Sequence, residues 1–177
     1  MQVGTFNISK RYVTAVAIIF VAMSLLRQHL RGGIGGHYVL QQETLPFVSN
    51  WWGVLLLPAL TWILWGRIEA RCADKSSARE LLNSGILFVL GVALGLLISV
   101  SFLNEYNFLL DNVVYVLLIV SLIFPIYYAE FMLGFVIAMV NTFGVVLPTV
   151  FALIMALVGF LIYRLITLPI LKNFRQR

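Results

Sequence analysis

The sequence predicts an all-α polytopic membrane protein, and composition is the first reason. Of its 177 residues, 62% are hydrophobic and 11% are charged, against roughly 45–50% and 25% in soluble domains. Its mean hydropathy is +1.00. A water-soluble fold needs a polar shell that this chain cannot supply. We therefore predict a single transmembrane helical domain over residues 1–177, with the lipid bilayer as its surroundings.

Apolar runs of the length that crosses a bilayer, about 17–25 residues, recur along the chain. The first follows Lys10 and Arg11 as in a signal peptide, but no clear cleavage site comes after it, so we predict a retained span. Four glycines between residues 32 and 36 then predict a loop. The second run carries a tryptophan pair near each end, as membrane interfaces favour. The predicted spans are 12–28, 47–65, 81–102, 108–127, 129–145 and 148–166.

A charged segment, residues 67–80, separates the second and third spans and is predicted to be a cytoplasmic loop. Its last residues, from Ser77 to Glu80, match the Ser-x-x-Glu capping box. In that motif a hydroxyl and a carboxylate each accept a hydrogen bond from a free backbone N–H at a helix start. The third span is therefore expected to begin here, and a chance match in a polar loop is the alternative.

The charge distribution decides the number of spans near the C-terminus. Residues 112–163 contain a single charge, Glu130, and helix breakers at Pro125, Gly144 and Pro148 divide them. Cytoplasmic loops collect Lys and Arg. Six spans with both termini inside place ten of the twelve Lys and Arg in the cytoplasm, whereas five spans divide them six and six. We therefore predict a bundle of six transmembrane helices, N-in and C-in, with five spans as the alternative.

Glu130 is the leading candidate for a solute or ion path, because ionisable groups at membrane depth are rare and often mark such paths. Tyr127 and Tyr128 precede it and could donate hydrogen bonds to it. The alternative is that Glu130 lies in the turn between the fourth and fifth spans, near the lipid headgroups. Asn141 is a candidate because an amide in hydrocarbon needs a partner, with interhelical packing as its alternative role. Asp111 is a candidate at the start of the fourth span, although helix capping explains it better.

Small residues at helical spacing predict where helices approach closely. Gly91, Gly95 and Ser99 form such a stripe in the third span. Gly134 and Ala138 share one helix face with Asn141. A further stripe in the sixth span consists of Ala152, Ala156 and Gly159. The spacing does not say whether the facing helix belongs to the same chain, so a homo-oligomer or a membrane protein partner stays open.

Neither a metal site nor a cofactor is predicted. His29 and His37 are the only histidines and could bind a metal with Glu43, but the glycines between them imply no fixed geometry. The single cysteine, Cys72, excludes an internal disulfide. No basic run indicates nucleic-acid binding, and the enzyme motifs HExxH and GxSxG are absent.

Three functions follow in order. The first is a small integral protein of the plasma membrane, the inner membrane of a bacterium, that binds or passes a small solute or ion and is not an enzyme. The alternative is a non-enzymatic scaffold or accessory subunit of a larger complex. The third is a lipid-active membrane enzyme with Glu130 and Asp111 as acid and base. A polar cavity would favour the first, a packed interior the second, and converging titratable groups the third.

Overall fold

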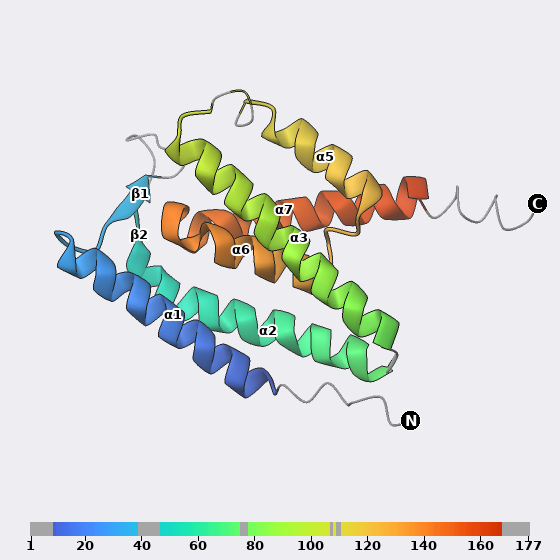
Figure 1. Cartoon of the computed structure of the whole chain (residues 1–177), viewed down its shortest axis with the longest axis horizontal. Coiled ribbons are helices and arrows are strands. Elements are labelled where there is room, and N and C mark those ends of the chain that lie inside the picture. Colours follow the sequence, from blue (N-terminus) through green and yellow to red (C-terminus); the bar gives the residue numbers. More distant parts are fainter. Residues whose placement is uncertain (1–8, 39–46, 75–77, 107, 109–110, 168–177) are drawn as a thin grey trace, which may run out of the picture.

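The computed structural model describes residues 9–38, 47–74, 78–106, 108 and 111–167, which form a bundle of helices (Figure 1). A short hairpin of β1 (Gly36–Tyr38) and β2 (Phe47–Ser49) and a 3-10 turn, η2 (Asn50–Trp52), lie between the first two helices. A π-helical turn, η3 (Tyr163–Thr167), continues the last helix. The six α-helices of the described residues are α1 (Lys10–Leu30), α2 (Gly53–Asp74), α3 (Ala78–Leu103), α5 (Val113–Ile123), α6 (Ala129–Phe143) and α7 (Val146–Ile162).

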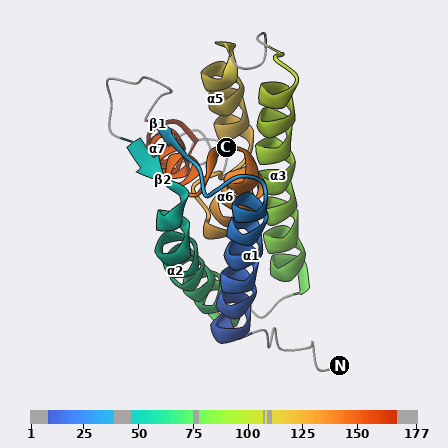
Figure 2. The ribbon, with the colours of Figure 1, turned by 90° about the vertical axis from the view of Figure 1, so that its left-hand side faces the viewer.

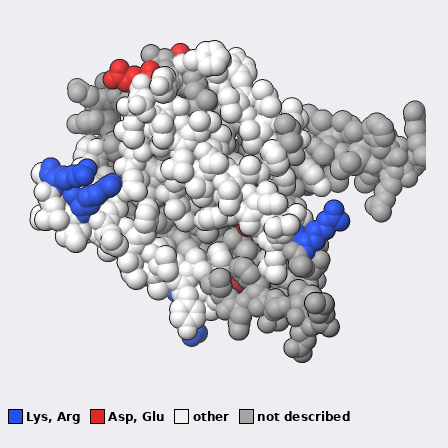
Figure 3. Space-filling view, in the orientation of Figure 1, with Lys and Arg blue, Asp and Glu red and all other residues white. Residues whose placement is uncertain are grey.

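The predicted class, a helical membrane bundle, is confirmed by the length and composition of these helices. Four of them, α1, α2, α3 and α7, are long and apolar enough to cross a membrane. The other two are apolar but shorter: α5 has 11 residues and α6 has 15, or roughly 16 and 22 Å of helix. The face drawn in Figure 3 is white over its central part, with Lys and Arg mainly near its margins.

The segment predicted as a polar loop, residues 67–80, is largely helical. α2 continues to Asp74 and α3 begins at Ala78. One continuous stripe of α2 explains this extension, because it is buried at spacings of three or four residues from Leu57 through Thr61, Leu64 and Ile68 to Cys72. The predicted span ends at residue 65, at the tryptophan pair, although the buried stripe runs on for two more turns.

The second predicted span also begins too early. Residues 47–49 form β2, which pairs antiparallel with β1 so that Gly36 lies opposite Ser49. Gly32 and Gly33 have φ values of +122° and +121°, a region that other residues rarely adopt. The glycine-rich segment therefore ends α1, as expected. Among the later spans, the fourth differs most, since α5 covers residues 113–123 of the predicted 108–127.

Contacts at the two ends of the bundle fix the helix directions. At one end, which we call the Arg71 end, Arg71 of α2 contacts Ser84 of α3 and Glu130 of α6. At the other, the Asn141 end, Asn141 of α6 contacts Ser24 and Arg27 of α1. α1, α3 and α6 therefore run in one direction, while α2 runs in the other.

α6 lies at the centre of the bundle. It packs along α3 and also contacts α2 and α7, as the side view shows (Figure 2). Phe131, Leu133, Phe135 and Val136 are each at most 2% exposed. Large apolar side chains on the outer helices are instead exposed, as membrane lipid requires, and they include Ile19, Ile119, Ile154 and Leu157.

Glycines allow α3 and α6 to approach closely. A Cβ atom added at Gly91 would collide with the carbonyl oxygen of Phe131, and one at Gly134 with that of Phe88. A Cβ at Gly95 would lie 2.8 Å from the Cβ of Ala138. The small-residue stripe of α3 is thus covered by α6 of the same chain.

The predicted small residues of α7 also face the chain itself. Ala152 is 3% exposed, and Ala156 packs against the core. A Cβ at Gly159 would lie 2.8 Å from Ile126. Ser99, the last member of the α3 stripe, is 4% exposed, and its hydroxyl has no hydrogen-bond partner.

Candidate functional site

The Arg71 end contains a buried ion pair between α2 and α6. The side chain of Glu130 is 3% exposed and that of Arg71 is 24% exposed. Nη2 of Arg71 donates to Oε1 of Glu130 and, at 3.1 Å, to Oγ of Ser84. The guanidinium also lies 4.2 Å from the ring centroid of Tyr128. One arginine therefore joins α2, α3, α6 and the segment that precedes α6.

The local sequence explains why these groups meet. The break at Pro125 ends α5, and α6 begins at Ala129, so Glu130 falls in the first turn of α6. A carboxylate is favoured there by the helix dipole. The extra turns of α2 beyond Trp65 bring Arg71 to the same level.

The second carboxylate oxygen of Glu130 is the unusual feature of this site. Oε2 is buried and has no hydrogen-bond partner. Buried polar groups are normally satisfied, and an ionised carboxylate loses much of its hydration energy in an apolar interior. This oxygen can therefore accept a proton or a hydrogen-bond donor without displacing a protein partner.

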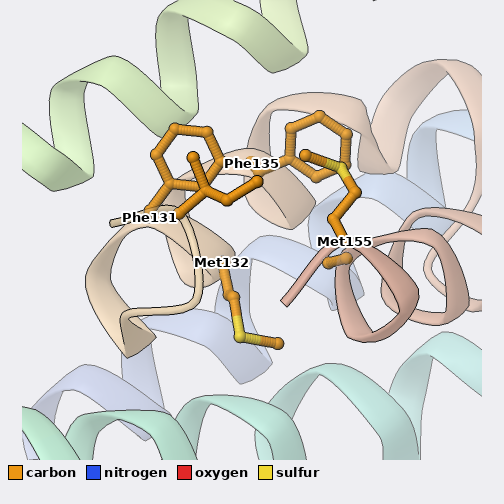
Figure 4. Close-up of a pocket in the computed structure, with 6 residues that line it drawn as sticks. Phe131, Met132, Phe135 and Met155 are labelled. Carbon is orange, nitrogen blue, oxygen red and sulfur yellow. The ribbon is translucent and has the colours of Figure 1, made fainter. Parts of the chain in front are cut away.

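The interior next to this site is closed. One turn along α6, side chains enclose a space that has no room for a water molecule, as the close-up shows (Figure 4). Its lining residues are Ile126, Phe131, Met132, Phe135, Ala152 and Met155. Glu130 therefore has no water-filled route along this side of α6.

Tyr127 and Tyr128 lie beside the pair, but their rings make the contacts. The ring of Tyr127 is 4.8 Å from that of Tyr128 and 5.4 Å from that of Tyr163, centroid to centroid. Burial and then the neighbouring Tyr128 raise the pKa of Tyr127, which lies in the connection between α5 and α6, above its usual value. Its hydroxyl therefore remains protonated and able to donate.

Asn141 forms a second polar site near the other end of α6. Its Oδ1 accepts hydrogen bonds from Oγ of Ser24 at 3.0 Å and from Nη2 of Arg27 at 3.1 Å. Gly134 and Ala138 face α3, whereas the Asn141 side chain bonds to α1. The three residues predicted to share one face therefore contact two different helices. Eleven residues separate Asn141 from Glu130, or roughly 16 Å of helix.

Asp111 is remote from Glu130 and makes no helix cap. It is exposed and precedes α5, whereas Glu130 follows that helix. The cap residue of α5 is Asn112, which makes no side-chain capping bond and instead donates to the carbonyl oxygen of Phe108 at 2.8 Å. The capping role expected for this segment is therefore wrong.

The histidines do not gather acidic or sulfur ligands in the described part of the chain. His29 lies in the last turn of α1 and His37 in β1, while Glu43 lies outside the described residues. Within those residues, no group of three or more His, Cys, Asp or Glu could hold a metal ion.

Sequence reasoning missed Arg71 and Ser84 as members of the site. Arg71 was assigned to the cytoplasmic loop with the other charges between spans two and three. The signal that could have found it is the buried stripe of α2, which ends at Cys72 beside it. Ser84 carried no signal, since one serine near a helix start is unremarkable.

A shallow groove between α5 and α7 is the other feature with open volume. It measures about 120 Å³, below the roughly 300–1,000 Å³ of small-molecule pockets. Ser121 is its polar residue, and that hydroxyl already donates to the carbonyl oxygen of Leu118 at 2.7 Å. The remaining lining is apolar and consists of Val114, Leu117, Leu118, Ile126, Phe151, Ile154, Met155 and Val158.

No protein-family model, curated protein or solved structure matches the chain. Its function must therefore be inferred from the side chains described above.

Proposed function

We propose that the protein binds or passes a small solute or ion through its helical bundle, and that the Arg71–Glu130 pair is the binding site. The observation that carries this proposal is the buried Oε2 of Glu130, which has no partner. Ionisable groups in membrane proteins are costly and often lie on solute or ion pathways. A carboxylate needed only to hold helices together would be expected to use both of its oxygens.

The proposed topology has six spans, with both termini in the cytoplasm of a plasma membrane. The alternating helix directions support it. The Arg71 end holds basic residues at the start of α1, the end of α2, the start of α3 and in η3, namely Lys10, Arg11, Arg67, Arg71, Arg79 and Arg164. The Asn141 end has Arg27 and Arg31. The positive-inside rule therefore favours a cytoplasmic Arg71 end.

Passage would require α6 to move. The polar groups at Glu130 and Asn141 are separated by an apolar stretch of α6 that includes Phe131 and Phe135, both at most 2% exposed. A solute cannot cross this stretch while α3 and α6 are in contact. The bond from Arg71 to Glu130 is one that any shift of α6 against α2 must break.

The accessory-subunit alternative has one observation in its favour, the apolar groove between α5 and α7. The packed interior around α6 suits that role too. The small-residue stripes no longer support it, because Gly91, Gly95 and Gly159 contact other helices of the same chain. The lipid-enzyme alternative has no support, since Asp111 and Glu130 lie beyond opposite ends of α5, roughly 16 Å apart along its axis.

Ion movement into liposomes tests the proposal. The purified chain would be reconstituted, and gradients of H⁺, Na⁺, K⁺ and Cl⁻ would be applied in turn, with dyes reporting the internal concentrations. We expect the wild-type chain to dissipate at least one gradient faster than protein-free liposomes, and Glu130→Gln to lose that activity. Glu69→Gln is the matched control, because Glu69 is a carboxylate at the same end that accepts a bond from the backbone of Lys10 at 2.6 Å.

Binding without transport would also support the proposal, so thermal stability would be measured in the same four ions. A stabilisation by one ion that Glu130→Gln abolishes counts as binding. If no ion moves and none stabilises the wild-type chain, the accessory-subunit alternative replaces this proposal.

A further inference from the structure

We infer that the ligand of the Arg71–Glu130 site is the proton, and that its addition to Glu130 releases Arg71 and loosens α2 from α6. This inference rests on the proposed function and names the ion. The binding step is simple: one proton adds to the carboxylate, giving a neutral carboxylic acid, and no other bond needs to form.

The geometry favours the proton because the site has no room for a larger ligand. Oε2 of Glu130 is fully buried, and the adjoining space along α6 cannot hold a water molecule. A metal cation such as Mg²⁺ or Ca²⁺ needs about six or more oxygen ligands, and no second carboxylate joins Glu130 among the groups described around it. A proton needs one lone pair, which Oε2 provides.

A route for the proton exists on the arginine side of the pair. Arg71 is 24% exposed, whereas Glu130 is 3% exposed. Water that reaches the guanidinium can therefore approach the carboxylate as Arg71 swings outward. Because arginine stays protonated in proteins, Glu130 is the member of the pair that changes charge.

Other charged and titratable groups near Glu130 are few. α2 presents Arg71 and Cys72, and its Glu69 is occupied by the backbone N–H of Lys10. α3 contributes Ser84, with Arg79 and Glu80 in its first turn, where both make interactions of their own. The remaining groups are Tyr127 and Tyr128 before α6 and Tyr163 and Arg164 in η3.

Arg71 can remain charged after it loses Glu130. It keeps the hydroxyl of Ser84, the ring of Tyr128 and its exposed fraction. The carboxylic acid formed at Glu130 is neutral and tolerates burial much better than the carboxylate. Both products are therefore accommodated, and the contact they lose is the one that ties α2 to α6.

Infrared difference spectroscopy of the reconstituted full chain tests the inference directly. On lowering the pH, the wild-type protein should gain a carboxylic-acid C=O band at the frequency of an apolar environment. Glu69→Gln should keep this band, and Glu130→Gln should lose it. If the wild-type band is absent at every pH at which the protein stays folded, or if Glu130→Gln retains it, the inference is wrong.

Cys72 provides a second readout, because it lies next to Arg71, is 7% exposed and has its Sγ 3.8 Å from Oγ of Ser84. Glu130→Gln mimics the neutral acid, so at a fixed pH a small maleimide should label Cys72 several-fold faster than in the wild-type chain. Labelling at the wild-type rate would show that neutralising Glu130 does not loosen α2. If Glu130→Gln does not fold, Glu130→Asp replaces it, and a shifted infrared band then identifies the residue.

The two proposals fail in different ways. Movement of Na⁺, K⁺ or Cl⁻ that needs Glu130, in a protein whose Glu130 never protonates, would overturn the proton inference and leave the proposed function standing. Protonation of Glu130 without any ion movement or ion-linked stabilisation would support the proton site and remove passage from the proposed function.

Discussion

Adding one methyl group to α3 should destabilise the bundle at Gly91 and not at Gly85. Both glycines lie in α3, so replacement by alanine brings each the same gain in helix propensity, about 0.5–1 kcal/mol. Their surroundings differ. A Cβ at Gly85 meets nothing within 4 Å, whereas a Cβ at Gly91 would collide with the backbone of Phe131 in α6. The pair of variants therefore isolates the contact between the helices.

The expected difference follows from these numbers. Forcing an extra carbon into a packed contact costs about 1–3 kcal/mol. Gly85→Ala should therefore be neutral or stabilising by up to about 1 kcal/mol, and Gly91→Ala should lie about 1–3 kcal/mol below it in free energy of unfolding. Gly91→Leu should be worse, because a backbone carbonyl cannot move aside as a side chain can.

Unfolding in detergent micelles, followed by helical circular dichroism as a denaturing detergent is added, measures both variants. Thermal unfolding gives an independent ranking. If Gly91→Ala is as stable as Gly85→Ala, the close approach of α3 and α6 is wrong, and with it the central position of α6.

Three further outcomes are expected. Arg71→Ala should destabilise the chain by about 3–5 kcal/mol, more than Glu130→Gln does, because it leaves the less exposed partner as an unpaired charge; this loss should shrink as the pH falls, since protonation removes that charge, and unfolding of both variants at several pH values checks it. In a chain whose Cys72 is replaced, cysteine near Gly35 should react with impermeant thiol reagents on right-side-out vesicles and cysteine at the C-terminus should not; external labelling of the C-terminus would favour five spans. In alkaline titration followed by tyrosinate absorbance, Tyr127→Phe should remove a residue that ionises above the usual tyrosine pKa, and removal of an ordinarily titrating residue instead would contradict its burial beside Tyr128.

The class and the helix packing could be predicted from sequence because each depends on local pattern. Apolar runs gave six helices, although the ends of α2 and α5 were displaced. The stripe of Gly91 and Gly95 correctly marked a close helix contact. That stripe could not identify the opposing helix, because α6 lies far along the chain, and no pattern in α3 names its neighbour.

The site was half predictable. Glu130 stood out as one charge in a long apolar segment, but Arg71 was hidden among the other charges of residues 67–80. A charge next to a helix end looks the same in sequence whether it meets solvent or a buried carboxylate. Only the three-dimensional path of α2 distinguishes the two. The same limit applies to Asn141, whose partners Ser24 and Arg27 precede it by more than a hundred residues.

The central position of α6 has a consequence for biosynthesis. The ribosome completes α1, α2 and α3 before α6 exists, so the membrane first receives these helices without the segment that fills the space between them. During that interval Arg71 has no counter-ion, and the glycine face of α3 is covered by lipid or by an insertion factor. A nascent chain that stops after α5 therefore exposes a polar and poorly packed surface, which quality-control proteases recognise. Resistance to proteolysis should accordingly arise late in translation, once α6 has been released into the membrane.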